Sequence, residues 1–121
     1  MKILVIDDDT NVSQAMRAIL AQHRYDTILV PRATAGLLAL AFDRFNLVIV
    51  DIFMPGMGGL DTIAQIRKQS SIPIIAASGF HMRHRPDIDY HAGALRYGAT
   101  ACLRKPFTPS QLIATVDKCL A

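Results

Sequence analysis

The sequence predicts an α/β fold in which a parallel β-sheet is covered by helices on both faces. The chain has 121 residues, of which 51% are hydrophobic, which is enough for one ordinary domain with its own core. Short apolar runs alternate along the chain with segments of helical periodicity, the pattern of a repeated β-α unit. The runs are continuously apolar and rich in β-branched residues, which favours strands buried on both faces of a parallel sheet.

The elements follow in order from these patterns. Strands are expected at 3–6, 27–30, 47–50, 73–77 and 101–103. Apolar residues at helical spacing are Val12, Ala15, Met16, Ile19 and Leu20, then Leu37, Leu38, Leu40, Ala41 and Phe42, then Leu60, Ile63 and Ile66, and finally Leu112, Ile113, Val116 and Leu120. The stretch 80–89 is irregular, and a fourth helix is expected at 90–97 because Gly98 is a typical helix stop.

The ends of the helices carry local signals as well. The last helix has the strongest one, because Thr108 can cap it, Pro109 suits its first position and Gln111 completes a capping box. Thr10 and Asn11 are available as caps of the first helix.

Polar and charged residues follow four of the five expected strands. They are Asp7, Asp8 and Asp9 after the first strand, Asp51 at the end of the third, Ser78 after the fourth and Lys105 after the fifth. In an open parallel sheet the carboxyl ends of the strands meet at one edge, where ligands bind. We therefore expect these groups to form one site, apart from Asp9, which is better placed to cap the first helix.

The chemistry of this set points to phosphoryl transfer. Neighbouring carboxylates repel one another, and Mg²⁺ removes that repulsion because it prefers carboxylate, water and phosphate oxygens. A carboxylate can also act as a nucleophile and form an acyl phosphate. Lys105 and the Ser78 hydroxyl could bind phosphate oxygens. Each residue alone would read as a cap or a loop residue, so the prediction rests on the combination.

Composition excludes several other classes of protein. The net charge is +3, but the basic residues are scattered apart from the stretch 83–85, so we expect no direct nucleic-acid binding by this domain. The N-terminus does not read as a signal peptide and no apolar stretch is long enough for a membrane span. Cys102 and Cys119 lie in apolar contexts and are expected to be reduced. The expectation is a cytoplasmic protein that does not enter a membrane.

At this point the motifs resemble those of the receiver domains of bacterial response regulators, including the single-domain chemotaxis type. The motifs are ILVIDDD at 3–9, VDIFMPGMGGL at 50–60, ASG at 77–79, GA at 98–99 and KPF at 105–107. The resemblance covers essentially the whole chain. It implies one receiver domain over residues 1–121, with a flavodoxin-like (βα)₅ fold and the strand order 2-1-3-4-5.

The resemblance also implies roles for the residues at the sheet edge. Asp51 matches the phosphoacceptor, and the cation would be magnesium or manganese. Asp8 matches a direct metal ligand and Asp7 a ligand that acts mainly through water, while Asp51 and the backbone carbonyl of Phe53 would supply further oxygens. Ser78 matches the hydroxyl residue that engages the phosphoryl group.

Lys105 matches the lysine of the family pattern, with a cis peptide bond expected before Pro106. In this family a histidine kinase or a phosphotransfer protein donates the phosphoryl group, and the receiver itself catalyses the transfer to its own aspartate. The chain is therefore expected to be a switch that controls a target protein, as a monomer or weak dimer, and not a turnover enzyme.

Three features depart from the family pattern. Cys102 stands where the family usually has a Tyr or Phe that rotates on activation, and Phe53 and Phe80 replace residues that are often polar. The segment between Ser78 and Gly98 is also enlarged. We expect residues 79–97 to be the moving element, although a surface insertion without function, or a metal site built from His81, His84 and His91, stays open.

The sequence is also compatible, to differing degrees, with three other functions. The chain could be a receiver trimmed from a hybrid kinase or a DNA-binding regulator. It could be an interaction domain that works without phosphorylation, although the complete acidic site argues against this. An aspartyl phosphatase with a D-x-D-x-T or D-x-D-x-V motif is disfavoured, because Asn11 occupies the last position of that motif.

Overall fold

A computed structural model describes residues 1–54, 56–79 and 89–121 of the protein. The strands are β1 (Lys2–Ile6), β2 (Asp26–Val30), β3 (Leu47–Asp51), β4 (Ile74–Ser78) and β5 (Ala101–Arg104). The helices are α1 (Thr10–Gln22), α2 (Ala33–Phe42), α3 (Gly59–Arg67), α4 (Tyr90–Tyr97) and α5 (Pro109–Leu120). The strand ends differ from the expected ones by a residue at most.

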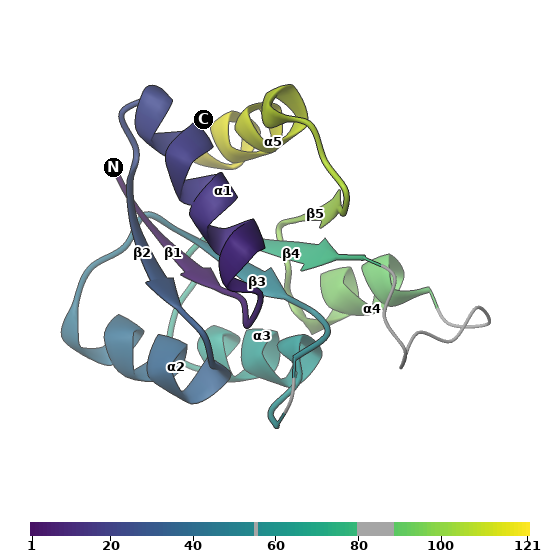
Figure 1. Ribbon diagram of the computed structural model, residues 1–121. Helices are drawn as coiled ribbons and strands as arrows, with labels where there is room; N and C mark the ends of the chain where they lie inside the picture. The colour runs from purple at the N-terminus through teal and green to yellow at the C-terminus, as the bar shows by residue number, and fades with distance from the viewer. Residues whose placement is uncertain (55, 80–88) are drawn as a thin grey trace.

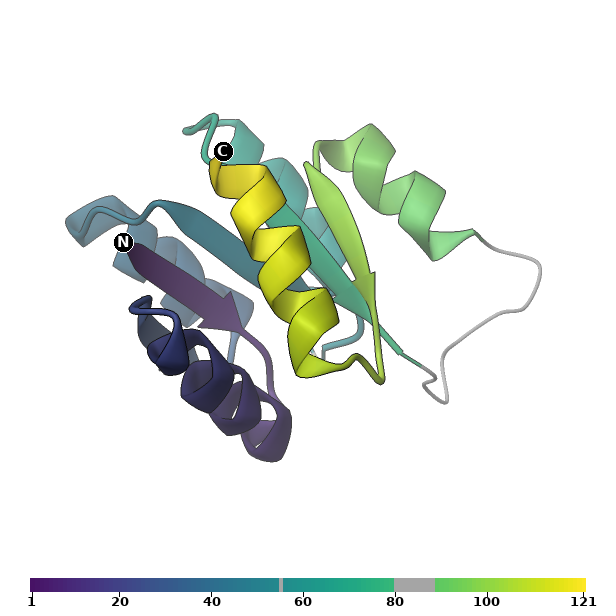
Figure 2. The same ribbon diagram turned by 90° about the horizontal axis from the view of Figure 1, so that it is seen from above.

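The strands form one parallel sheet in the order β2-β1-β3-β4-β5, which confirms the order that the resemblance implied. Helices α1 and α5 cover one face, and α2, α3 and α4 cover the other (Figures 1 and 2). The fold is therefore the predicted α/β sandwich of three layers.

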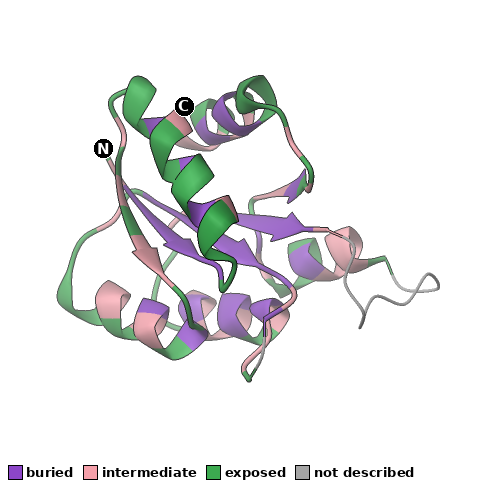
Figure 3. Ribbon diagram, viewed as in Figure 1, coloured by how far each residue is buried: buried purple, intermediate pink, exposed green. Residues whose placement is uncertain are grey.

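Successive side chains of the central strands pack against opposite helical layers. Leu4 and Ile6 of β1 lie in the cluster beneath α2 and α3, whereas Ile3 and Val5 lie in the cluster beneath α1 and α5. Strands β1, β3 and β4 are buried as predicted (Figure 3). The expected burial on both faces is wrong for β2 and β5, because they form the two edges of the sheet and are partly exposed.

The helix ends show which local signals operate. Asp9 caps α1 by accepting hydrogen bonds from the backbone N–H groups of Asn11 and Val12, so the available alternatives Thr10 and Asn11 lie inside the helix. The capping box of Thr108 and Gln111 at α5 forms as predicted.

Helix α4 is bounded by Asp89, whose carboxylate accepts from the N–H of Ala92, and by Gly98, which adopts φ 117°. Only glycine adopts this left-handed conformation without steric cost. In the described part of the chain, no helix has the length and apolar character needed to cross a membrane.

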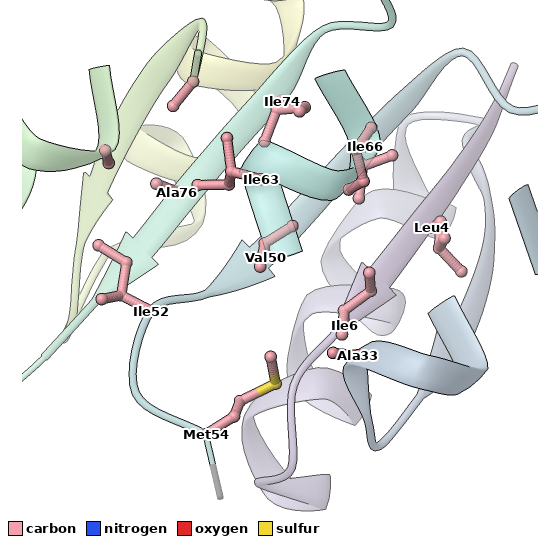
Figure 4. Packing of buried hydrophobic residues seen from close by; sticks show 13 residues of the cluster. Leu4, Ile6, Ala33, Val50, Ile52, Met54, Ile63, Ile66, Ile74 and Ala76 are labelled. Atoms are coloured by element: carbon pink, nitrogen blue, oxygen red, sulfur yellow. The ribbon is translucent and has the colours of Figure 1, made fainter. Parts of the chain in front are cut away.

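Hydrophobic packing holds the segment that follows β3 in place. Ile52 and Met54 are almost fully buried and point into the same cluster as Ile63 and Val50 (Figure 4). Because alternate residues after Asp51 are anchored in this way, the polar end of β3 has a defined position at the edge of the sheet.

Candidate phosphoryl-transfer site

The carboxyl ends of four strands bring together the side chains that the sequence singled out. Asp7 directly follows β1, Asp51 ends β3, Ser78 ends β4 and Lys105 directly follows β5. In the register of the sheet, Asp51 is paired with Ala77, the residue before Ser78. The predicted convergence at one edge is thus present in the structure.

Three carboxylates form the centre of this site. Asp7, Asp8 and Asp51 each offer an oxygen atom, and these atoms lie within 4.8 Å of one another. Asp7 and Asp51 are buried, whereas Asp8 is exposed and leaves the group open to solvent. This donor set fits a hard divalent cation, which takes carboxylate oxygens and retains several waters.

Lys105 neutralises part of the negative charge. Its Nζ lies 2.8 Å from Asp7 Oδ2 and 3.5 Å from Asp51 Oδ1. Burial acts to lower the pKa of Lys105, but the interactions with Asp7 and Asp51 outweigh it and hold the pKa above its ordinary value. Lys105 is therefore a fixed positive charge between two of the three carboxylates.

The Asp51 carboxyl has a strongly perturbed protonation equilibrium. Burial raises its pKa, the charge of Lys105 lowers it, and the negative charges of Asp7 and Asp8 raise it, with a net pKa of about 7. The N–H of Phe53 donates to Asp51 Oδ1 at 3.2 Å and favours the charged form. Asp51 consequently needs further positive charge nearby to be fully ionised at neutral pH.

Glycine allows helix α3 to approach the end of β3. A Cβ atom at Gly59 would lie 2.3 Å from the backbone oxygen of Asp51, and the Gly59 N–H donates to the Ile52 carbonyl at 2.9 Å. Any larger residue at position 59 would push apart the two backbones that fix the acidic group. Gly59 belongs to the motif quoted above, but sequence reasoning gave it no role of its own.

Ser78 has a partner that sequence reasoning missed. Its Oγ lies 2.6 Å from Nε2 of His91 on the first turn of α4, and the serine is only 7% exposed. The thiol of Cys102 contacts the backbone oxygen of the same histidine at 3.6 Å. His91 was considered only as a metal ligand, because its distance of 13 positions from Ser78 carries no sequence signal.

A pocket of about 560 Å³ opens beside the carboxylates. Asp8, Asp51 and Lys105 line its polar end, and apolar side chains of α1 and of the loop between β5 and α5, including Ile19 and Phe107, line much of the rest. The site is therefore accessible from outside and is flanked by an apolar wall.

Of the remaining expectations, one is confirmed, and others concern residues outside the described part of the chain or stay untested. The peptide bond between Lys105 and Pro106 is cis, as the resemblance implied. His81, His84 and Phe80, together with the basic stretch 83–85, lie outside the described residues, as do residues 80–88 of the expected moving segment. Among the residues that are described, Asp7, Asp8 and Asp51 form the group suited to a metal ion, and His91 is bonded to Ser78 instead. The roles of Ser78, Lys105 and the Phe53 carbonyl stay predictions.

Comparison with known proteins identifies the family. Residues 3–117 match the response regulator receiver domain. The DNA-binding response regulator MtrA of Mycobacterium tuberculosis is 32% identical over 115 residues, which cover 95% of this chain and 48% of that protein. The CpxR homolog of Haemophilus influenzae, a transcriptional regulatory protein, is 34% identical over 121 residues, with 98% and 50% coverage. The chain thus spans about half the length of these relatives.

Solved structures agree. The receiver domain of NtrX from Brucella abortus superposes with a TM-score of 0.88 at 29% identity, covering 98% of this chain and 97% of that one. The chemotaxis response regulator CheY4 of Vibrio cholerae gives a TM-score of 0.86 at 27% identity, covering 98% of each chain. The chain belongs to the response regulator receiver domain family of two-component systems.

Proposed function

We propose that Asp51 is the phosphoacceptor of this receiver domain. Proteins of the family are phosphorylation-dependent switches that bind a divalent cation at an acidic pocket. The observation that supports Asp51 is its place in the site: it ends β3, is only 6% exposed, and lies in ion-pair distance of Lys105 and beside Asp7 and Asp8.

In the proposed reaction an oxygen of Asp51 attacks the phosphorus atom of a phosphorylated histidine. The new P–O bond forms as the P–N bond breaks, and the donor imidazole leaves with the bonding electron pair and is protonated. Lys105 would bind a phosphoryl oxygen, and the Ser78 hydroxyl would donate to another. Magnesium or manganese, held by Asp7, Asp8, Asp51 and the Phe53 carbonyl, would neutralise charge on the transferred group.

The partners follow from this chemistry. The donor would be a histidine kinase or a phosphotransfer protein, which would reach Asp51 through the pocket beside α1 and the loop between β5 and α5. The phosphorylated domain, comprising residues 1–121, would then control a target protein in the cytoplasm as a monomer or weak dimer. It would turn over no substrate and bind neither nucleic acid nor membrane by itself.

The proposal is tested by incubating the protein with a small acyl phosphate and Mg²⁺ and measuring the intact mass. One phosphoryl group should be added to the unmodified protein and none to Asp51→Asn. Asp26→Asn, at the exposed start of β2, is the matched control and should react normally. An equal yield for Asp51→Asn would reject the assignment.

A second candidate function is that of the receiver part of a longer DNA-binding regulator. It is favoured by the relatives, which include a DNA-binding response regulator about twice the length of this chain. An antibody against the receiver, applied to extracts of the native cells, would distinguish the two. A band larger than a 121-residue chain would favour the longer protein.

A further inference from the structure

Two neighbouring residues attach the first turn of α4 to the site. His91 Nε2 lies 2.6 Å from Ser78 Oγ. The ring of Tyr90 meets the ring of Phe53 nearly edge-on, with 4.7 Å between the centroids and 67° between the planes. Since Ser78 ends β4 and Phe53 is the second residue after Asp51, both contacts connect α4 to segments that carry the reacting groups.

The imidazole does more than fill space between α4 and β4. If packing were the only role of this half-buried position, an apolar side chain would serve better than histidine. A polar ring that is removed from water without a hydrogen-bond partner costs free energy. His91 instead places a ring nitrogen at hydrogen-bond distance from a hydroxyl that is almost fully buried. The direction in which the Ser78 hydroxyl points therefore depends on which of the two groups donates.

The number of protons in this pair limits what Ser78 can do. A serine hydroxyl has one proton and two lone pairs, and a neutral imidazole donates through one nitrogen and accepts through the other. If Ser78 donated to His91, its only proton would be unavailable to a phosphoryl oxygen. If His91 donates from Nε2, Ser78 accepts with a lone pair and its proton remains free.

We infer that His91 is a positioning residue for the phosphoryl site: its Nε2–H donates to Ser78 Oγ and directs the hydroxyl proton of Ser78 toward the phosphoryl oxygen. This inference rests on the proposed function of Asp51. His91 itself contacts Ser78 and not the reacting atoms, so its effect on the reaction passes through the serine.

The same bond couples the site to α4. The backbone oxygen of His91 contacts the Cys102 thiol on β5, and Asp89 caps the helix one position before it begins. A shift of Ser78 toward a phosphoryl group must therefore stretch the bond to His91 or displace the first turn of α4. In either case the His91 ring reports the phosphorylated state.

Nitrogen-15 NMR of the histidine rings in the unmodified protein tests the proton assignment. Beryllofluoride with Mg²⁺ is used as the phosphoryl mimic. We expect a hydrogen on Nε2 of His91, and a change in the ring shifts of His91 when the mimic binds. His23, exposed at the end of α1, should not change. A hydrogen-free Nε2 at His91, or an unchanged His91 when the mimic is bound, would overturn the inference.

Substitutions test the effect on the reaction. The rate of phosphorylation by a small acyl phosphate should fall about tenfold in His91→Leu, the effect of losing one hydrogen bond that orients a reacting group. His91→Gln should restore part of the rate, because its amide N–H can reach the same hydroxyl. His23→Leu removes a histidine outside the site and should have no effect.

A double substitution separates positioning from packing. In a Ser78→Ala background, His91→Leu should cause no further loss, because the group that it positions is gone. An undiminished further loss there, or a normal rate for His91→Leu alone, would overturn the inference while leaving Asp51 as the phosphoacceptor. If the unmodified protein takes up no phosphoryl group at all, the proposed function fails and the inference fails with it.

Discussion

Replacing Asp51 with Asn should stabilise the cation-free protein, and the gain should grow with pH. The Asp51 carboxyl is 6% exposed. Burial raises its pKa from 3.8 to about 7, with the charge of Lys105 opposing the rise and Asp7 contributing to it. The neutral amide of asparagine has the shape of the carboxyl without the cost of a buried charge.

The sign and size follow from proton linkage. A carboxyl with a higher pKa in the folded chain binds its proton more tightly when folded, so this contribution to stability is complete below pH 3.8 and is lost as the pH rises to about 7. Each pKa unit corresponds to about 1.4 kcal/mol, which gives a total of about 4 kcal/mol. Relative to the unmodified protein, Asp51→Asn should gain about 1.5 kcal/mol at pH 5 and about 4 kcal/mol at pH 8.

The assay is urea unfolding in the presence of a chelator between pH 5 and pH 8, with the free energy of unfolding extrapolated to zero denaturant. Asp26→Asn, whose carboxyl lies on the exposed edge strand β2, is the matched control and should show no such trend. A gain for Asp51→Asn that does not vary with pH would refute the reasoning, as would a loss of stability at pH 8.

Five further substitutions probe the site and its surroundings. Gly59→Ala should destabilise the fold by about 1–3 kcal/mol in urea unfolding, because its methyl group would collide with the backbone of β3. Gly93→Ala, with a nearest contact of 3.8 Å, should be neutral or slightly stabilising. Asp9→Ala should lose about 1 kcal/mol of stability with its cap and retain Mg²⁺ affinity in a titration, whereas Asp8→Ala should lose the affinity. Lys105→Ala should still be phosphorylated but should show a smaller change of hydrogen exchange in α4.

For each of these predictions, one experimental result would contradict it. Equal destabilisation by the two alanine substitutions for glycine would show that the close approach at the end of β3 is unimportant. A loss of metal in Asp9→Ala as complete as in Asp8→Ala would show that the division between cap and ligand is wrong. An undiminished exchange response in phosphorylated Lys105→Ala would remove this lysine from the switch.

The gathering of polar residues at one edge of the sheet was predictable from the sequence, because it follows from the topology of a parallel sheet. Once the apolar runs before Asp7, Asp51 and Ser78 were interpreted as parallel strands, their carboxyl ends had to meet. The start of α5 was predictable for a different reason, since Thr108 and Gln111 interact within a single turn. The capping signal is complete within a few residues, whereas the convergence at the sheet edge follows from the parallel direction of all the strands.

The remaining features depend on relations that no local pattern contains. The partial exposure of β2 follows from its place at the edge, which strand order decides. The bond between Ser78 and His91 depends on how α4 is set against β4 and β5 and on which way one ring points.

The central claim is tested most directly by locating the phosphoryl group. After reaction with an acyl phosphate and Mg²⁺, borohydride reduction converts an aspartyl phosphate into homoserine, and peptide mass spectrometry identifies the modified position. Homoserine should be found at position 51 and at no other aspartate. A product at Asp7 or Asp8, or phosphorylation that leaves Asp51 unmodified, would contradict the account.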